Sequence, residues 1–298
     1  MLSLLCLSES AAHALKITGF YLLLALGSYL LGNISNAKIL ARTQKDDITK
    51  HDSGNPGTIN MLRTHGVSMG FFTLILDMLK GAIPCIIGFF AFGGFNNFME
   101  AKIAIYVAGT AAVIGHCYPV FYKFKGGKGV ATAAGMACVA HPWIALILFG
   151  VYVALLIITK IGSLSSLIIA FAYIIYDSVT LIIDKNYVAL GLLIFVLLLI
   201  VWRHKANIKR LIEKRENVID LQEAVNKDVQ RINKHRQKKQ QKNTEVDAQT
   251  KNVADNNSQS DVVNTQTETI KSEEVGAQEP VKSEETNVTE PQQSEKKG

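Results

Sequence analysis

Six apolar runs, each close to or above the length that crosses a lipid bilayer, constrain what this chain can fold into. They cover residues 17–34, 67–95, 103–122, 130–159, 164–183 and 187–202. A helix that crosses the hydrocarbon core needs about 20 apolar residues. Soluble proteins do not carry a series of such runs with almost no amphipathic helix between them. The sequence therefore predicts an all-α integral membrane protein.

The fourth run is too long for one crossing, and it contains a proline. Its 30 residues would make a helix of about 45 Å, whereas the hydrocarbon core is about 30 Å thick. Pro142 favours the start of a new helix at this point. We therefore expect a short helix over 130–140 and a second over 142–160, which brings the total to about seven transmembrane helices. The alternative is that the short helix is re-entrant.

The distribution of basic residues predicts how the chain is oriented. Lys and Arg gather in 42–63, in 123–128 and after Trp202. Short cytoplasmic loops are enriched in these residues, and the three places fall on one side only if the fourth run crosses twice. We therefore expect a multi-pass protein of the cell membrane with its N-terminus outside and its C-terminal tail in the cytoplasm.

Charge also divides the chain into three parts. Residues 1–202, 203–242 and 243–298 have net charges of +5, +8 and −7, which together give the +6 of the whole chain. Every Phe, Trp and Tyr lies at or before Trp202. We expect a transmembrane core, then a basic amphipathic helix, then a disordered acidic tail. The basic helix either lies on the anionic inner leaflet, pairs with a partner helix or serves as a solvated linker.

The first of several polar clusters lies between the first two runs, at 47–63. Its Ser-Gly-Asn-x-Gly turn can aim successive backbone N–H groups at an anion, and its side chains add neutral donors and one forked cation. The candidate phosphate ligands are Ser53, Asn55, Gly57, Asn60 and Arg63. The alternative is an ordinary polar loop.

The second cluster lies inside an apolar run. Asp77 and Lys80 are three residues apart and therefore share a helix face. Ionisable residues inside a membrane span are costly, and they usually pair with each other or line a polar site. A purely structural pair is the alternative, and the two roles are compatible.

The third cluster, over 115–132, is the strongest signal. Its Lys-Gly-Gly-Lys-Gly segment stands just before a predicted helix, so that glycines let the backbone approach a phosphate and the helix N-terminus adds favourable dipoles. It is not a Walker A loop, because Gly129 follows Lys128 where Ser or Thr is required. A basic loop with snorkelling lysines is the alternative. The candidates are Lys125, Gly126, Gly127, Lys128, Gly129 and Thr132, with His116 as a candidate base.

A fourth and weaker cluster opens the basic segment. His204 and Asn207 share a helix face where the last span leaves the bilayer, although ordinary basic flanking explains this segment equally well. The sequence has no readable metal-binding constellation and no Ser-His-Asp arrangement. We expect no cofactor, no metal and no nucleic-acid partner, and we expect one or more phosphates to bind beside lipid.

These clusters, in this order, resemble the motifs of the bacterial acyl-phosphate-dependent glycerol-3-phosphate acyltransferases. The family pattern GHxxPxFxxFKGGKGVAT is matched throughout 115–132, and the resemblance covers about residues 17–215. The other motifs are matched by Asp77, Lys80, Gly81 and Pro84, by Ser53, Gly54, Asn55, Gly57, Asn60 and Arg63, and by His204, Asn207, Ile208 and Arg210.

The departures from the family pattern lie mostly in the first motif. The family usually has Ser-Ile-Pro where Asn33, Ile34 and Ser35 stand. It usually has Arg in place of Thr49, Gly in place of Asp52, and Ala-Thr in place of Thr58 and Ile59. The missing hydroxyl at Ile59 removes one contact that the pattern would otherwise supply.

The resemblance implies an enzyme with a cytoplasmic-face active site, completed by the start of the basic segment. It would transfer an acyl group from acyl phosphate to the 1-hydroxyl of glycerol 3-phosphate, giving lysophosphatidate and inorganic phosphate, the first step of phospholipid synthesis. Membrane lipid and the upstream acyl-phosphate-forming enzyme are further expected partners. The implied catalytic set is Ser53, Arg63, Lys128, His204 and Asn207.

The resemblance assigns supporting roles to other residues. Asp77 and Lys80 would organise the polar centre. The base stays open, because His116, His204 or the phosphate of the substrate itself can accept the proton.

The sequence argues against two other functions and is compatible with a third. An acyltransferase that uses acyl-CoA or acyl-carrier protein would usually show His-x-x-x-x-Asp, and no histidine here has Asp at that spacing. A transporter of an organic phosphate would favour internally repeated halves, whereas the glycine-rich loop occurs once. A scaffold that recruits partners through its tail is compatible with the enzyme.

Overall fold

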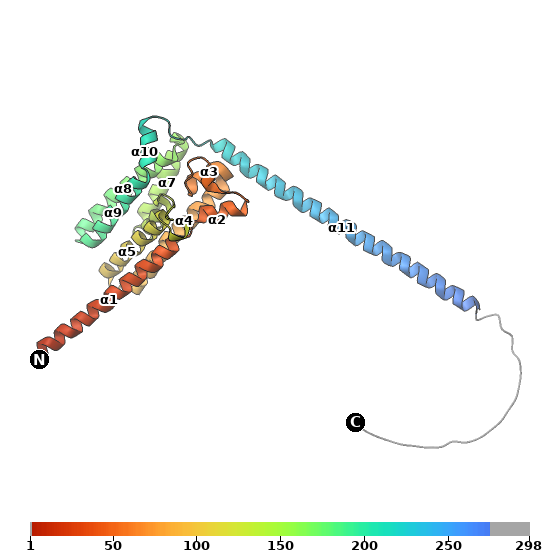
Figure 1. Ribbon diagram of the computed structural model, residues 1–298, viewed down its shortest axis with the longest axis horizontal. Helices are drawn as coiled ribbons and strands as arrows, with labels where there is room; N and C mark the ends of the chain where they lie inside the picture. The colour runs from red at the N-terminus through yellow and green to blue at the C-terminus, as the bar shows by residue number, and fades with distance from the viewer. Residues whose placement is uncertain (1, 275–298) are drawn as a thin grey trace, which may run out of the picture. The chain divides into compact units, whose positions relative to one another are not determined.

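The structure is a computed structural model that describes residues 2–274 (Figure 1). Two compact units divide the chain, Met1–Ile232 and Asn233–Gly298. Two 3-10 turns, Ile48–Lys50 and Val120–Tyr122, lie in connections between helices. In chain order the helices are α1 (Leu2–Gly32), α2 (Asn36–Thr43), α3 (Thr58–His65), α4 (Val67–Ala91), α5 (Phe98–Cys117), α6 (Val130–Ala140), α7 (Pro142–Thr159), α8 (Gly162–Ile183), α9 (Tyr187–Arg203), α10 (Lys205–Ile212) and α11 (Leu221–Glu274).

Helices α1, α4, α5, α7, α8 and α9 run side by side as a bundle (Figure 1). Five helical segments of the described chain are long and apolar enough to cross a membrane. Helices α9 and α10, which meet at a bend of 58°, make a sixth candidate span if they are counted together. These results confirm the predicted all-α integral membrane fold, in which helices satisfy every backbone N–H and C=O without water. The five segments are Ala14–Thr43, Val67–Ala91, Phe98–Tyr122, Pro142–Thr159 and Gly162–Ile183.

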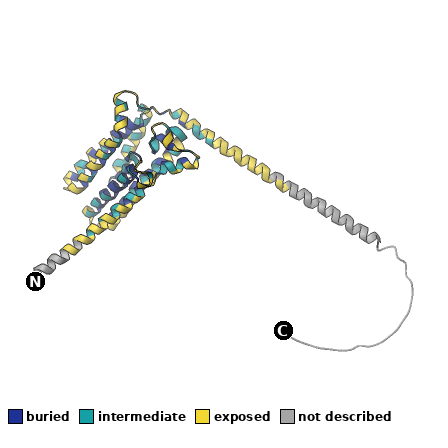
Figure 2. Ribbon diagram, in the orientation of Figure 1, coloured by how far each residue is buried: buried dark blue, intermediate teal, exposed yellow. Residues whose placement is uncertain are grey.

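Many large apolar side chains of the bundle point outward. Figure 2 shows buried residues along the inside of the bundle and exposed residues on its outer faces. Helix α7 has no buried residue, although the mean hydropathy of its apolar window is 2.4. Trp143 and Ile158, near its two ends, are each 77% exposed. An apolar face of this extent, turned away from the protein core, is the surface that lipid tails cover.

Pro142 divides the fourth apolar run as predicted, because it is the first residue of α7. Helix α6 has 11 residues, so it rises only about 16 Å. It is shorter than the helices that qualify as membrane spans, which number five, or six with the bent α9–α10 pair, in the described part of the chain. The predicted double crossing of the fourth run, and with it the seventh span, therefore stays a prediction.

Small residues allow the inner helices to approach closely. A Cβ on Gly32 or Gly115 would overlap the facing backbone of α5 or α1, and a Cβ on Gly81 or Gly135 would do the same between α4 and α6. Close contact through small residues is the usual way that helices associate in lipid, where burial of apolar surface supplies no driving force. These contacts fix α5 and α6, the two helices that flank the glycine-rich loop.

The structure corrects the prediction of one basic amphipathic helix over 203–242. The chain breaks after α10, where Lys214 adopts a left-handed φ of 54°, and α11 begins only at Leu221. The residues in the gap turn toward the core: Glu216 accepts hydrogen bonds there, and Ile219 is fully buried beside Leu62. Ile219 therefore packs on the body of the protein, whereas Ile212, Val218 and Val225 stay exposed, and the break between α10 and α11 interrupts the predicted continuous helical face.

Helix α11 continues to Glu274, and residues 275–298 lie outside the described residues. A polar helix gains little stability unless one of its faces is packed, so the helical course of α11 does not by itself decide whether 243–274 is ordered. The predicted disorder of 243–298 stays a prediction.

Candidate active site

All four polar clusters of the sequence contribute residues to one cavity. Its apolar arm is lined by residues of α6, α7, α8 and α9, namely Ala137, Ala145, Leu148, Tyr173, Ile174 and Leu193. Its polar end is lined by Ser53, Asn55, Gly57, Asn60, Arg63, Lys128, His204, Asn207 and Glu216. A second cavity shares Ser53, Asn55, Lys128 and Asn207 with the first. The site therefore offers hydrogen-bond donors at one end and an apolar surface at the other.

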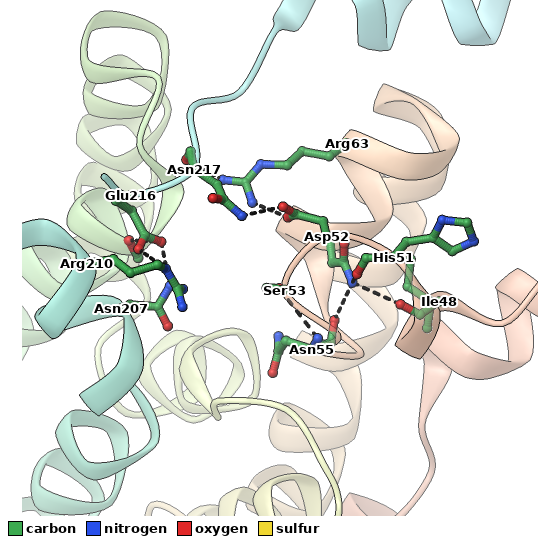
Figure 3. A network of polar contacts seen from close by, with 12 residues as sticks. Ile48, His51, Asp52, Ser53, Asn55, Arg63, Asn207, Arg210, Glu216 and Asn217 are labelled. Atoms are coloured by element: carbon green, nitrogen blue, oxygen red, sulfur yellow. Dashed lines mark hydrogen bonds and ion pairs between the residues drawn. The ribbon is translucent and has the colours of Figure 1, made fainter. Parts of the chain in front are cut away.

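The loop of the first cluster is folded around the side chain of Asn60. This residue is 2% exposed. Its Nδ2 donates to the carbonyl oxygens of Ile48, His51 and Asn55 at 3.0, 3.1 and 3.0 Å (Figure 3). The amide nitrogen that the sequence suggested for phosphate binding is thus used to shape the loop, which presents Ser53 and Asn55 to the cavity.

Arg63, one turn further along α3, lines the same cavity, and both terminal nitrogens of its guanidinium already have a protein partner. Its Nη1 pairs with the carboxylate of Asp52, and its Nη2 donates to the carbonyl oxygen of Asn217 at 2.6 Å (Figure 3). Its Nε is buried and has no partner among the described residues. A guanidinium has five N–H donors, so two of them hold the cation in place and the others are available to a ligand.

The glycine-rich loop of the third cluster lies directly on His116, near the end of α5. The Gly127 N–H donates to the carbonyl oxygen of His116 at 3.0 Å, and a Cβ on Gly127 would overlap the imidazole ring. From the end of α9, Arg203 donates through Nε and Nη2 to the carbonyl oxygens of Gly127 and Gly126, at 2.9 and 2.7 Å. Glycine is required at these positions because the loop is held tightly between α5 and α9.

Lys128 is the cation that connects the two cavities. Among the Lys and Arg residues that the structure describes, it alone lines both. It has no hydrogen bond or ion pair within the described part of the chain. Burial lowers the pKa of Lys128 to about 8, although the nearby carboxylate of Glu216 opposes the shift. A partly buried cation without a fixed protein partner is suited to pair with an arriving phosphate.

The second cluster forms a buried network beside the cavity. Lys80 Nζ lies 3.0 Å from Asp77 Oδ1 and donates to the Ile34 carbonyl oxygen at 2.7 Å. Asn36 donates to the same carboxylate oxygen at 2.9 Å, and His116 Nδ1 is 3.9 Å from it. Asp77 therefore connects α4 to the α1–α2 junction and to α5. Asp77 and His116 line the cavity, whereas Lys80 does not.

His204 follows the last residue of α9 and has a defined tautomer. Its Nδ1 lies 2.8 Å from the carbonyl oxygen of Ile200. A carbonyl oxygen only accepts hydrogen bonds, so we assign the ring proton to Nδ1, which leaves Nε2 as an acceptor. His204 is 2% exposed and lines the cavity.

Glu216 closes the polar end from the gap between α10 and α11. Its carboxylate accepts from Asn207 Nδ2 at 2.5 Å, from Arg210 Nε at 2.7 Å and from Ser163 Oγ at 3.0 Å (Figure 3). Burial acts to raise the pKa of Glu216, but hydrogen bonds from these three groups outweigh it and hold the pKa below its usual range. Asn207 is thereby fixed at the cavity wall.

Comparison with known proteins identifies the family. Residues 22–214 match the family model for glycerol-3-phosphate acyltransferase. The chain is 38% identical over 204 residues to the glycerol-3-phosphate acyltransferase of Shewanella woodyi, covering 68% of this chain and 95% of that protein. It is 39% identical over 193 residues to glycerol-3-phosphate acyltransferase 2 of Bacillus anthracis, covering 64% and 95% respectively. The chain belongs to the glycerol-3-phosphate acyltransferase family.

Solved structures agree with this assignment. The acyltransferase is similar to the crystal structure of PlsY (YgiH), an integral membrane glycerol 3-phosphate acyltransferase, in its glycerol 3-phosphate form, with a TM-score of 0.60 and 33% identity. The lysophosphatidic acid form gives a TM-score of 0.58. Each comparison covers 69% of this chain and 98% of the other. The family predicted from the sequence motifs is therefore confirmed.

The structure of this acyltransferase gathers most of the predicted site residues at the two cavities. Three of them line neither cavity. Lys80 is bound to Asp77 and a backbone carbonyl, Gly127 packs on the imidazole of His116, and Thr132 is fully buried against Gly81 of α4. The residues at the first cavity are Ser53, Asn55, Gly57, Asn60, Arg63, Asp77, His116, Lys128, Gly129, His204 and Asn207, and those at the second include Lys125 and Gly126.

Two residues that build the acyltransferase site were missed from the sequence. Arg203 directly precedes His204, but its position at the end of a span made it look like ordinary basic flanking. Glu216 is one of 5 acidic residues among 13 basic ones in 203–242. An acidic residue in such a basic segment was the one available signal for Glu216, because a carboxylate there has cations nearby to pair with.

Proposed function

We propose that this acyltransferase takes its acyl group from acyl phosphate and transfers it to the 1-hydroxyl of glycerol 3-phosphate. The products are lysophosphatidate and inorganic phosphate, and the reaction is the first step of phospholipid synthesis. The observation that carries the proposal is the cavity that joins Arg63 and Lys128, at one end, to an apolar arm reaching Tyr173 and Leu193. The polar end suits a phosphate, and the apolar arm suits an acyl chain.

Each substrate carries a phosphate, and the cations support two phosphate positions. Arg63 and Lys128 line the first cavity, whereas Lys125 and Arg210 join Lys128 at the second. Ser53 lines both and adds a hydroxyl donor. Because Lys128 connects the cavities, two bound phosphates would hold the attacking hydroxyl close to the acyl carbon, and such proximity accelerates a reaction between two substrates.

The chemistry requires no covalent enzyme intermediate, because the acyl carbon of acyl phosphate is already activated. Oxygen O1 of glycerol 3-phosphate forms a bond to this carbon, the bond between the carbon and the phosphate oxygen breaks, and inorganic phosphate leaves. The Lys128 ammonium and the N–H groups of Gly126 and Gly129, which line the cavities, would stabilise the negative charge that develops on the reacting oxygens. No cofactor is required for this step.

The proton of the attacking hydroxyl needs an acceptor. His204 Nε2 is the better placed of the two histidines, because Nδ1 is held by the Ile200 carbonyl and the ring lines the cavity. The His116 ring is packed beneath Gly127. We therefore assign the proton to His204, with the phosphate of the substrate itself as the alternative acceptor.

We place the active site on the cytoplasmic side of the cell membrane, with the N-terminus outside. Basic residues from separate segments support this orientation, because they meet at the site end of the bundle. Lys38 Nζ is 3.4 Å from the Lys125 carbonyl oxygen, and Lys205 of α10 lines the same cavity. Short cytoplasmic segments carry such an excess of basic residues. Glycerol 3-phosphate and the upstream acyl-phosphate-forming enzyme would then reach the site from the cytoplasm.

One assay tests the proposed reaction. The purified full-length protein in lipid nanodiscs is supplied with radiolabelled glycerol 3-phosphate and synthetic palmitoyl phosphate, without coenzyme A. We expect labelled lysophosphatidate to form, and none to form when palmitoyl-CoA replaces palmitoyl phosphate. Product from palmitoyl-CoA alone would overturn the acyl-phosphate donor. Uptake of label into proteoliposomes without product would favour the transporter.

The state of Lys128 predicts a pH dependence. Because burial lowers its pKa to about 8, its positive charge is lost as the pH rises through that value, and kcat/KM should fall there, since this ratio reports the free enzyme. In Lys128→Arg the guanidinium stays charged, so the falling limb should move up by about one pH unit or more even if the rate is lower. An alkaline limb that is identical in both proteins would contradict the assignment.

A further inference from the structure

We infer that Asp52 and Asn217 are positioning residues that hold the Arg63 guanidinium in the orientation that binds the substrate's phosphate. The three side chains and one carbonyl form a closed ring (Figure 3). Arg63 Nη1 pairs with one carboxylate oxygen of Asp52, and Asn217 Nδ2 donates to the other. Arg63 Nη2 donates to the carbonyl oxygen of Asn217 at 2.6 Å. Both ends of the guanidinium fork are therefore fixed.

The N–H donors that the ring leaves free point to the ligand. The ring uses two of the five guanidinium N–H groups, and Nε is buried with no partner among the described residues. Because Arg63 lines the first cavity, a phosphate bound there would accept charge-assisted hydrogen bonds from the N–H groups that remain on the Nη nitrogens. The inference thus rests on the proposed function, in which we assign the phosphate beside Arg63 to glycerol 3-phosphate and the phosphate of the acyl donor to the second cavity, beside Lys125 and Arg210.

Asp52 is held at the position from which its carboxylate reaches Arg63. Its φ is +45°, in the left-handed region, which Asp enters more readily than most residues other than glycine. A glycine would adopt this backbone conformation without strain, so Asp52→Gly removes the carboxylate and leaves the loop free to keep its course.

Asn217 is held by a segment that lies beyond the family match, which ends at residue 214. We call residues 216–231 the strap. The N–H of Ile219 donates to the Lys160 carbonyl oxygen at 2.8 Å, and the Ile219 side chain is fully buried. Further along, Lys227 Nζ donates to the Arg63 carbonyl oxygen at 2.6 Å, and Asp228 accepts from the Ser68 N–H at 2.9 Å. On the other side of Asn217, the Glu216 carboxylate accepts from Asn207, Arg210 and Ser163, so the strap is anchored on both sides.

These anchors preorganise Arg63. A free arginine side chain loses rotamer freedom when it binds a phosphate, and fixing it beforehand removes this cost from the binding step. The loss of the ring should therefore weaken the binding of glycerol 3-phosphate and leave the chemical step almost unchanged, which raises KM at constant kcat. The alternative is that the Asp52 carboxylate competes with the phosphate for Arg63, and in that case its removal would lower KM.

The test compares Asp52→Asn, Asp52→Gly and Asn217→Ala with the wild type as full-length proteins in nanodiscs. With palmitoyl phosphate saturating, we expect KM for glycerol 3-phosphate to rise about tenfold in both Asp52 variants, the change expected from a lost hydrogen bond to a charged group, with kcat within about twofold. Asn217→Ala keeps the carbonyl, so its effect should be smaller. Glu213→Gln, which removes an exposed pair with Arg215, is the matched control and should match the wild type.

Direct binding separates this inference from the proposed reaction. Calorimetry with glycerol 3-phosphate alone should show the same loss of affinity in the Asp52 variants, whichever acyl donor the enzyme uses. If the wild type binds glycerol 3-phosphate but makes no product from palmitoyl phosphate, the donor proposal fails and the binding data still decide the role of the ring. An unchanged or tighter affinity in both Asp52 variants would overturn the inference. The double variant Asp52→Gly/Asn217→Ala should lose no more than Asp52→Gly, because the three groups act as one unit.

Discussion

Replacing Lys128 with alanine is expected to lower kcat/KM for acyl transfer about 10³-fold, the loss seen when a preorganised transition-state donor is removed. Lys128 is the one described Lys or Arg residue that lines both cavities. Its ammonium would therefore contact the leaving phosphate and the phosphate of the attacking substrate, and no neighbouring cation can replace it at both. Initial rates of lysophosphatidate formation from palmitoyl phosphate measure the effect.

The same variant should fold normally. Lys128 has no hydrogen bond or ion pair within residues 2–274, so its removal leaves no protein group unpaired and takes a partly desolvated charge out of the site. Thermal unfolding in the same detergent should stay within a few degrees of the wild type.

Lys125→Ala is the matched control for the loss of one positive charge. It belongs to the same loop but lines only the second cavity, and its loss should cost much less than the loss of Lys128. Normal turnover by Lys128→Ala, or equal losses in the two variants, would contradict a phosphate position centred on Lys128.

The helices of the bundle follow from the apolar runs because the bilayer leaves the backbone little choice. An apolar run in lipid must satisfy its own N–H and C=O groups, so it forms a helix. Pro142 could be assigned to the start of α7 because its ring fits the first turn of a helix and disrupts an interior, and the structure has it there. The family could be recognised because the glycine-rich loop is continuous in sequence.

The short helices and the outer wall of the site were harder to predict. Helix α3 has eight residues and begins inside what reads as a polar loop. It is held by Asn60, whose amide bonds three carbonyls of that loop, and no local pattern reveals such a contact. Arg203 reaches the loop carbonyls across 76 residues of sequence, and Glu216 depends on the break after α10. Contacts of this kind depend on tertiary packing, which sequence periodicity does not encode.

The second large effect is expected at Asp77, where alanine should destabilise the folded protein by about 3–5 kcal/mol, the usual cost of removing one partner of a buried ion pair. Asp77 and Lys80 are 2% and 4% exposed. Without the carboxylate, the Lys80 ammonium keeps only the Ile34 carbonyl as a partner, and Asn36 loses its acceptor. Thermal or denaturant unfolding in a fixed detergent measures the change.

A double variant shows whether Asp77 and Lys80 only stabilise the fold or also take part in the reaction. Replacing a buried ion pair with apolar residues of similar volume is often neutral for stability, so Asp77→Leu/Lys80→Met should unfold close to the wild type, well above Asp77→Ala. Its activity should stay low, because Asp77 also lines the cavity and lies 3.9 Å from His116. Recovery of both stability and turnover would show that the pair only supports the fold. If stability does not recover, the bonds from Asn36 and to Ile34 hold the α1–α2 junction more strongly than the ion pair itself.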